Sequence, residues 1–158
     1  MTYILKLNRY SLNAYSLKIL IVDDDTDDSL MLSEAIEKIL PSYNFHFEGD
    51  GEDALEYIER QDAPDLLFLD VNMPKKNGID CLKVINDLNL LPDTPIIIYS
   101  TSNRENDIDQ CYSLGAMSYI VKPSSCKELT RLVKLAISTL GIPKSERLNK
   151  QNFVLQSR

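Results

Sequence analysis

Short apolar runs alternate with segments of helical period along most of the chain. Apolar residues dominate five runs of strand length, which span Lys18–Val22, Asn44–Glu48, Asp65–Leu69, Pro95–Tyr99 and Ala116–Val121. Between the runs, apolar residues recur at three- and four-residue spacing, which is the period of an amphipathic helix. The same period continues after the last run, from Leu129 to Leu140. The pattern predicts five strands, each followed by a helix.

Polar residues and glycine mark the ends of the predicted helices. Ser102 with Glu105, and Ser125 with Glu128, have the spacing of a capping box, which satisfies free N–H groups in a first helical turn. Gly115 suits the opposite end of a helix, where the backbone turns left-handed. These signals predict helix starts after Ser102 and Ser125.

The alternation of strand and helix determines the expected architecture. Five rounds of it favour a parallel sheet with helices on both faces and right-handed crossovers. Most runs are continuously apolar, as strands buried on both faces must be. The second run differs because Phe45 and Phe47 flank His46, an alternation typical of an edge strand. We therefore predict an α/β fold with a doubly wound sheet of five parallel strands in the order 2-1-3-4-5.

Charged and hydroxyl side chains follow four of the predicted strands. They are Asp23, Asp24, Asp25, Asp70, Ser100, Thr101 and Lys122, the last followed by Pro123. In doubly wound sheets, ligands bind beyond the carboxyl ends of the strands. A purely structural sheet does not need carboxylates, hydroxyls and an ammonium group at one edge. We therefore expect the functional site there.

The carboxylates of this edge need a compensating charge. Two carboxylates about 5 Å apart repel by roughly 3 kcal/mol at an effective dielectric constant near 20. Hard oxygen ligands without clustered histidine or cysteine favour Mg²⁺ or Mn²⁺ over zinc. Such a cation, together with Lys122, would neutralise the charge of an incoming phosphoryl group. Asp70 is thereby a candidate nucleophile that forms an acyl phosphate.

Composition and charge exclude several other classes of protein. The chain has 158 residues, 44% of them hydrophobic, which suits one folded domain. No apolar run approaches the roughly 20 residues of a membrane-spanning helix.

The net charge of the whole chain is −7, but the charge is unevenly distributed. Residues 19–140 contain 10 basic and 23 acidic residues. A net charge of −13 disfavours direct binding of nucleic acid. After the first strand, where dinucleotide-binding sheets have a glycine-rich turn, this chain has the three carboxylates Asp23 to Asp25. This difference argues against dinucleotide binding.

The cysteine count indicates a reducing compartment. Cys81, Cys111 and Cys126 are odd in number and widely spaced, and no secretory signal precedes them. This pattern argues against a disulfide framework or a zinc site. We expect three buried core thiols and a cytoplasmic protein.

Five sequence pieces stand in order at the predicted strand ends. They are Ile-Leu-Ile-Val-Asp-Asp at 19–24, Leu-Asp-Val-Asn-Met-Pro at 69–74, Gly78, Ser100 and Tyr-Ile-Val-Lys-Pro at 119–123. Together they resemble the receiver domains of two-component response regulators, over roughly residues 17–140. The resemblance implies a flavodoxin-like receiver fold, as in single-domain chemotaxis regulators.

The resemblance also implies a phosphoacceptor and a metal site. Asp70 would accept the phosphoryl group from a phosphohistidine. Mg²⁺, or Mn²⁺, would bind directly to Asp24, to Asp70 and to the backbone carbonyl of Asn72. Asp23 would complete the acidic pocket and reach the ion through a water molecule.

Further positions match the family's phosphoryl contacts and its switch. Lys122 and Ser100 would contact the phosphoryl oxygens. Tyr119 matches an aromatic residue whose ring moves inward when the hydroxyl of Ser100 shifts. The peptide bond before Pro123 matches one that is cis in the family, which costs only about 0.5–1 kcal/mol before proline.

Two residues depart from the family's usual pattern. Ser100 replaces the commoner threonine, so its hydroxyl lacks a methyl group that restrains the rotamer. We expect a looser switch. Thr101 occupies a position that is usually small, beside the path of the phosphoryl group. We expect slower phosphoryl entry or hydrolysis.

Several acidic and aromatic residues have ordinary structural explanations. Asp25, Asp27 and Asp28 are expected to cap a helix and to compensate its dipole rather than to bind metal. His46 is expected to have a structural or surface role on the edge strand, so the chain itself would not transfer phosphate through histidine. By pattern alone Tyr119 is a core aromatic, and only the resemblance favours a switch role.

Three functions compete for the carboxylate site. The preferred one is a stand-alone phosphoacceptor switch that catalyses phosphoryl transfer to, and hydrolysis from, its own aspartate. A phosphatase of the haloacid-dehalogenase type needs a second acid two residues after the nucleophile, where this chain has Asn72. A binding module that works without phosphorylation is disfavoured by the intact set of Asp24, Asp70 and Lys122.

The resemblance implies partners and a division of the chain. A sensor histidine kinase or a histidine phosphotransfer protein would donate the phosphoryl group, and an unknown downstream protein would bind the phosphorylated form, with no direct contact to nucleic acid or membrane. A homodimer linked to phosphorylation is a further expectation. Residues 1–16 are expected to be an N-terminal extension, which is a flexible arm, an extra edge strand or a misassigned start. Residues 141–158 are expected to be a tail without an output domain, in which Phe153–Leu155 docks on the body or on a partner.

Overall fold

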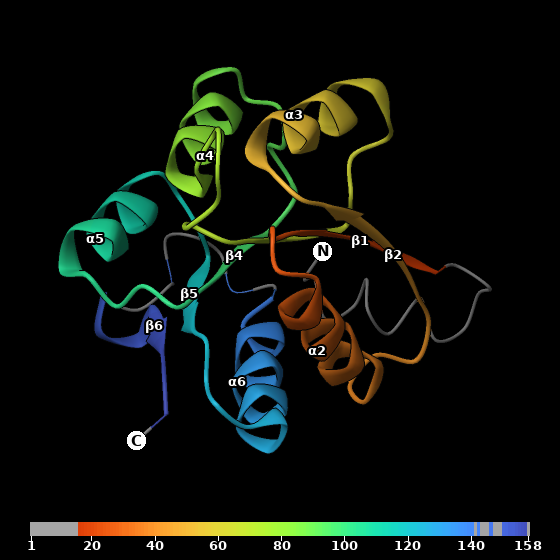
Figure 1. Cartoon of the computed structure of the whole chain (residues 1–158), viewed down its shortest axis with the longest axis vertical. Helices are drawn as coiled ribbons and strands as arrows, with labels where there is room; N and C mark the ends of the chain where they lie inside the picture. Colours follow the sequence, from red (N-terminus) through yellow and green to blue (C-terminus); the bar gives the residue numbers. More distant parts are fainter. Residues whose placement is uncertain (1–15, 141, 143–145, 147–149, 158) are drawn as a thin grey trace.

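A six-stranded parallel sheet forms the centre of the computed structural model, which describes residues 16–140, 142, 146 and 150–157. Its strands are β1 (Leu17–Val22), β2 (Tyr43–Glu48), β3 (Leu66–Leu69), β4 (Ile96–Ser100), β5 (Ser118–Val121) and β6 (Val154–Leu155). They lie in the order β2-β1-β3-β4-β5-β6 (Figure 1). The predicted order of the first five strands is confirmed. The sixth strand, in the expected tail, extends the sheet beyond the prediction.

Helices cover both faces of the sheet. They are α2 (Thr26–Glu37), α3 (Gly51–Arg60), α4 (Gly78–Asp87), α5 (Glu105–Ser113), α6 (Cys126–Ser138) and the 3₁₀-helix η1 (Lys150–Asn152). Figure 1 shows α3, α4 and α5 on one face, with α2 and α6 on the other. Each face buries its own apolar cluster against the sheet. Within the described part of the chain, no helix is both long and apolar enough to cross a membrane.

The strand patterns follow from the position of each strand in the sheet. Every residue of β3 and β4 is buried, as expected for central strands covered on both faces. No residue of β2 is fully buried, which confirms its predicted edge position. There His46 stacks on Tyr57 of α3, with 3.9 Å between ring centroids, and hydrogen-bonds to Glu48. These contacts support the structural role expected for His46.

Most of the predicted helix ends are confirmed. Asp25 caps α2 and accepts hydrogen bonds from the backbone N–H groups of Asp27 and Asp28. Ser125 caps α6 in the same way. Gly115 has a φ of 88° just beyond α5, a conformation that glycine adopts without strain.

The predicted cap at Ser102 is wrong. Helix α5 begins later, after Arg104, which makes no side-chain cap. The hydroxyl of Ser102 instead donates to the buried carboxylate of Asp107 at 2.6 Å and accepts from the N–H of Arg104. The reason is burial: Asp107 needs a donor inside the protein, and Ser102 supplies it.

The cysteines follow the prediction at two of three positions. Cys81 and Cys111 are buried, and burial raises the pKa of each thiol to about 12, so both stay protonated. Cys126 is exposed, which contradicts the expectation of a core thiol. It is the first residue of α6, where the amphipathic stripe that faces the sheet has not yet begun.

The C-terminal segment docks on the body, as one of the expected alternatives stated. Strand β6 pairs in parallel with β5, and the N–H of Tyr119 donates to the carbonyl of Phe153 at 2.8 Å. The side chain of Phe153 is buried. The expectations for residues 1–15, and for the parts of the tail at 141, 143–145, 147–149 and 158, lie outside the described residues.

Candidate functional site

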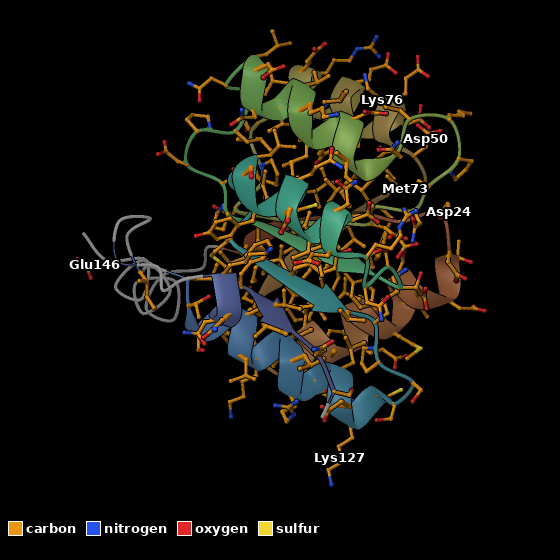
Figure 2. The ribbon with its side chains drawn as sticks, turned by 90° about the vertical axis from the view of Figure 1, so that its left-hand side faces the viewer. Asp24, Asp50, Met73, Lys76, Lys127 and Glu146 are labelled. Carbon is orange, nitrogen blue, oxygen red and sulfur yellow. The ribbon has the colours of Figure 1, made fainter. Side chains whose placement is uncertain are left out.

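Three carboxylates meet at the carboxyl edge of the sheet. Asp23 and Asp24 follow β1, Asp70 follows β3, and one oxygen of each lies within 4.8 Å of the others. Asp23 and Asp70 are buried, whereas Asp24 is exposed. Figure 2 shows Asp24 on the same side of the molecule as Met73, from the loop after β3. This set of hard oxygen donors fits Mg²⁺ or Mn²⁺, with an open side for water or a ligand.

Lys122, at the end of β5, neutralises part of this charge. Its Nζ lies 2.6 Å from Asp23, 2.8 Å from Asp28 and 3.1 Å from Asp70, and it stands 4.9 Å from the ring centroid of Tyr99. Burial by itself would lower the pKa of Lys122. The hydrogen bonds to Asp23 and Asp28 outweigh burial, so its pKa is raised and the ammonium group stays charged.

Asp23 is the carboxylate of the cluster whose pKa is raised. Burial raises its pKa, and the negative charge of Asp70 adds to this effect. The hydrogen bonds from Lys122 and from the N–H of Asp25 oppose the rise, and the resulting pKa is about 6. One lysine therefore does not fully compensate the buried carboxylates.

The raised pKa of Asp23 predicts a pH dependence of stability in the metal-free protein. Because Asp23 binds its proton more tightly in the folded than in the unfolded chain, its stabilising contribution is complete below pH 3.8 and is lost as the pH rises through about 6. In EDTA, the free energy of unfolding of the wild type relative to Asp23→Asn should fall on the order of 2 kcal/mol across that window. Urea unfolding of both proteins from pH 4 to pH 7 measures this difference. A difference that stays constant would contradict the assignment.

The loop after β3 fixes the orientation of Asp70. The N–H of Asn72 donates to Asp70 Oδ1 at 3.1 Å, and the N–H of Gly78 donates to the carbonyl of Val71 at 3.1 Å. A Cβ atom on Gly78 would lie 1.9 Å from the carbonyl oxygen of Asp70. Asn72 and Asp24 line the same open cavity, of about 620 Å³. Only glycine at 78 lets the start of α4 approach the acidic site this closely.

Ser100 and Tyr119 are joined through Ser102. The buried hydroxyl of Ser100 accepts from the N–H of Ser102 at 3.2 Å. The hydroxyl of Tyr119 donates to the carbonyl of Ser102 at 2.9 Å, and its ring is fully buried. Burial raises the pKa of Tyr119 to about 12, so the phenol stays a neutral donor. The amide of Asn72 lies 3.5 Å from Ser100 Oγ and 3.4 Å from Thr101 Oγ1, which links this group to the acidic edge.

The cis peptide implied before Pro123 is contradicted. The described residues contain no cis peptide bond. The trans isomer is the lower in energy even before proline. With this bond trans, Lys122 still reaches Asp23 and Asp70, and its N–H donates to the carbonyl of Ser100 at 2.8 Å.

Asp28 belongs to the site, although sequence reasoning assigned it only to the start of a helix. Its carboxylate, 2.8 Å from Lys122, is one of the lysine's three partners. The sequence carried a usable signal, because Asp28 is the third residue after the cap at Asp25 and side chains there lean back over the helix start. The side chain of Asp25, by contrast, makes the predicted capping contacts with the N–H groups of Asp27 and Asp28, and the N–H of Asp25 donates to Asp23.

Comparisons with known proteins agree with this geometry. Residues 19–134 match the family of the response regulator receiver domain. The transcriptional regulatory protein CpxR of Escherichia coli K12 is 39% identical over 117 residues, which are 74% of this chain and 47% of CpxR. The chain thus spans about half the length of this relative.

Two solved structures have the same fold. The phosphorylated cyanobacterial phytochrome response regulator RcpA superposes with a TM-score of 0.73 at 30% identity, over 80% of this chain and 94% of RcpA. The Mn²⁺-bound form of response regulator Rcp1 gives a TM-score of 0.70 at 28% identity, over 78% of this chain and 92% of Rcp1. The family match covers most of the chain, and the acidic edge, the lysine and the buried hydroxyl lie where the fold brings its strand ends together. The chain therefore belongs to the response regulator receiver domain family.

Proposed function

We propose that the chain is a stand-alone receiver that accepts a phosphoryl group on Asp70 and switches its binding to another protein. The observation that carries this proposal is the position of Lys122 Nζ, 3.1 Å from Asp70 inside a pocket of carboxylates. An ammonium group held there supplies the positive charge that a phosphoryl group on Asp70 would need. The phosphorylated form of RcpA, 94% of whose solved chain is matched, supports the acceptance of a phosphoryl group.

The reaction would proceed by direct displacement. A carboxylate oxygen of Asp70 attacks the phosphorus of a phosphohistidine, an O–P bond forms, the N–P bond breaks and the imidazole leaves. The donor would be a sensor histidine kinase or a histidine phosphotransfer protein. Lys122 would pair with the transferred oxygens, and later hydrolysis would restore Asp70 by attack of water on phosphorus. The chain would catalyse phosphoryl transfer only to and from its own Asp70. This reaction would take place in the cytoplasm.

A divalent cation fits the exposed side of the pocket. Asp24, Asp70 and the backbone carbonyl of Asn72 would hold Mg²⁺ or Mn²⁺, with Asp23 contacting it through water. When bound, the ion supplies positive charge that compensates the carboxylates and the phosphoryl oxygens. The Mn²⁺-bound form of Rcp1 supports this choice of metal.

The switch would use the hydrogen bonds around Ser102. When the hydroxyl of Ser100 turns toward a phosphoryl group on Asp70, it leaves the N–H of Ser102, whose carbonyl holds the phenol of Tyr119. Phosphorylation would thereby shift a population between two arrangements of this segment. The output would be a protein surface near Tyr119. A homodimer linked to phosphorylation would use the same surface.

Phosphorylation by a small donor tests the proposal. The chain should gain one phosphoryl group from acetyl phosphate or phosphoramidate in the presence of Mg²⁺, and none in EDTA. Intact mass spectrometry measures the gain. A chain that gains no phosphoryl group from either donor would refute the phosphoacceptor function and favour a module that binds without phosphorylation.

Removal of the exposed carboxylate should weaken metal binding. Asp24→Ala takes away a direct ligand, and we expect the affinity for Mg²⁺ to fall roughly ten-fold or more. Calorimetric titration of the unphosphorylated protein measures the affinity. The matched control is Asp27→Ala, which removes an exposed carboxylate of α2 outside the cluster and should leave the affinity unchanged. Unchanged affinity in Asp24→Ala would move the direct ligand to Asp23 or Asp25.

A further inference from the structure

The C-terminal segment covers the edge of the sheet next to Tyr119. We call residues 150–155 the strap. Val154 and Leu155 lie in register with Tyr119 and Ile120 of β5. The carbonyl of Phe153 accepts the N–H of Tyr119 at 2.8 Å. The outer edge of β5 is therefore occupied by the chain itself.

The strap also contacts helix α5. Lys150 forms ion pairs with Asp109 and with Glu105, the latter at 3.8 Å. The ring of Phe153 meets Tyr112 edge-to-face, with 5.2 Å between centroids, and is only 4% exposed. One aromatic anchor and one cation thus attach the strap to the helix that follows the Ser100–Ser102 segment.

The strap packs beside the ring of Tyr119. Tyr119 and Phe153 belong to the same apolar cluster, on the face covered by α3, α4 and α5. Strand β4 flanks Tyr119 on one side and the strap on the other. The ring of Phe153 lies beside the ring of Tyr119 at this sheet edge, with 6.2 Å between centroids, and would oppose an outward rotation of the Tyr119 ring past it. With the strap docked, the phenol stays on the carbonyl of Ser102.

We propose that the strap holds Tyr119 in its buried position, so that strap docking and phosphorylation of Asp70 favour each other. This inference rests on the proposed function and on the switch that the family resemblance implies, in which the ring of Tyr119 lies inward when the hydroxyl of Ser100 shifts toward the phosphoryl group. Coupling of two binding events is reciprocal. A strap that stabilises the buried ring therefore raises the affinity of the acidic site, and a ligand at that site tightens the strap. If the strap had to undock on phosphorylation, strap docking would instead lower the affinity of the acidic site.

Affinity for beryllofluoride with Mg²⁺ tests the first direction. Phe153→Ala removes the ring that would block an outward position of the Tyr119 ring. We therefore expect the affinity for beryllofluoride to fall by roughly five-fold or more. Phe47→Ala is the matched control, because it removes an exposed phenylalanine from β2 at the opposite edge of the sheet. Its affinity should equal that of the wild type. Equal or tighter binding by Phe153→Ala overturns the strap proposal and leaves the phosphoacceptor function intact, whereas no binding by the wild type overturns both.

Hydrogen exchange of the Tyr119 amide tests the second direction in the unsubstituted chain. This amide donates to Phe153, so its protection reports strap docking. Addition of beryllofluoride and Mg²⁺ should slow its exchange by a factor similar to the loss of affinity in Phe153→Ala, and should leave it unchanged in Asp70→Asn. This measurement decides the question even if Phe153→Ala fails to fold. Unchanged or faster exchange in the wild type on beryllofluoride binding overturns the proposal.

Discussion

Asp70→Asn should abolish acyl-phosphate formation. The amide that replaces the carboxylate has no nucleophilic oxygen. The asparagine side chain has nearly the same shape as the aspartate side chain. Its oxygen still accepts the N–H of Asn72, a contact of 3.1 Å in the wild type, so the loop after β3 should keep its conformation. With acetyl phosphate and Mg²⁺, intact mass spectrometry should find a phosphoryl group on the wild type and none on the variant.

The matched control for this variant is Asp25→Asn. It makes the same chemical change at the acidic edge, and asparagine caps a helix about as well as aspartate does. Within the described part of the chain, the Asp25 side chain contacts the backbone N–H groups of Asp27 and Asp28, so this control should be phosphorylated like the wild type. If Asp70→Asn gains the same phosphoryl mass, then Asp70 is not the acceptor.

Gly78→Ala should both destabilise the fold and slow phosphorylation. The added Cβ would lie 1.9 Å from the carbonyl oxygen of Asp70 and 2.9 Å from the Cα of Val71, both backbone atoms that cannot rotate away. Helix α4 or the end of β3 must therefore shift. Overpacking of this kind costs about 1–3 kcal/mol of unfolding free energy. Displacement of Asp70 by about 1 Å would slow phosphoryl transfer roughly 100-fold.

Urea unfolding and the rate of phosphorylation by phosphoramidate measure the two effects. Gly49→Ala is the matched control, since a Cβ at that position meets no atom within 4 Å. It should change neither quantity by much. A Gly78→Ala protein with wild-type stability and rate would show that α4 can move away without disturbing Asp70.

The sequence by itself determined the layers of the fold. Buried parallel strands must be apolar on both faces, so their runs stand out, and the weaker alternation of Phe45, His46 and Phe47 identified β2 as an edge. The carboxyl ends of parallel strands lie at one edge, which brings Asp23, Asp70 and the other strand-end residues together in space. Strand order and the location of the site therefore followed from local pattern and sheet geometry.

Contacts between distant segments could not be predicted in this way. The two-residue strand β6 has almost no pattern of its own, and it is strand because the edge of β5 offers it hydrogen-bond partners. Ser102 has the sequence of a cap, but the buried carboxylate of Asp107 takes its hydroxyl. A distant strand decided the outcome for β6, whereas for Ser102 the burial of a carboxylate in the first turn of α5 decided it.

The partners of Lys122 show the same division. Its place after β5 identified it as a site residue, whereas only the tertiary structure decided that Asp23, Asp28 and Asp70 all bind one ammonium group. Likewise, only the tertiary structure places Phe153 of the C-terminal segment beside the ring of Tyr119. Periodicity reports which face of an element is buried. Which side chains meet there depends on the docking of elements that are far apart in the chain, and on the burial and charge that result.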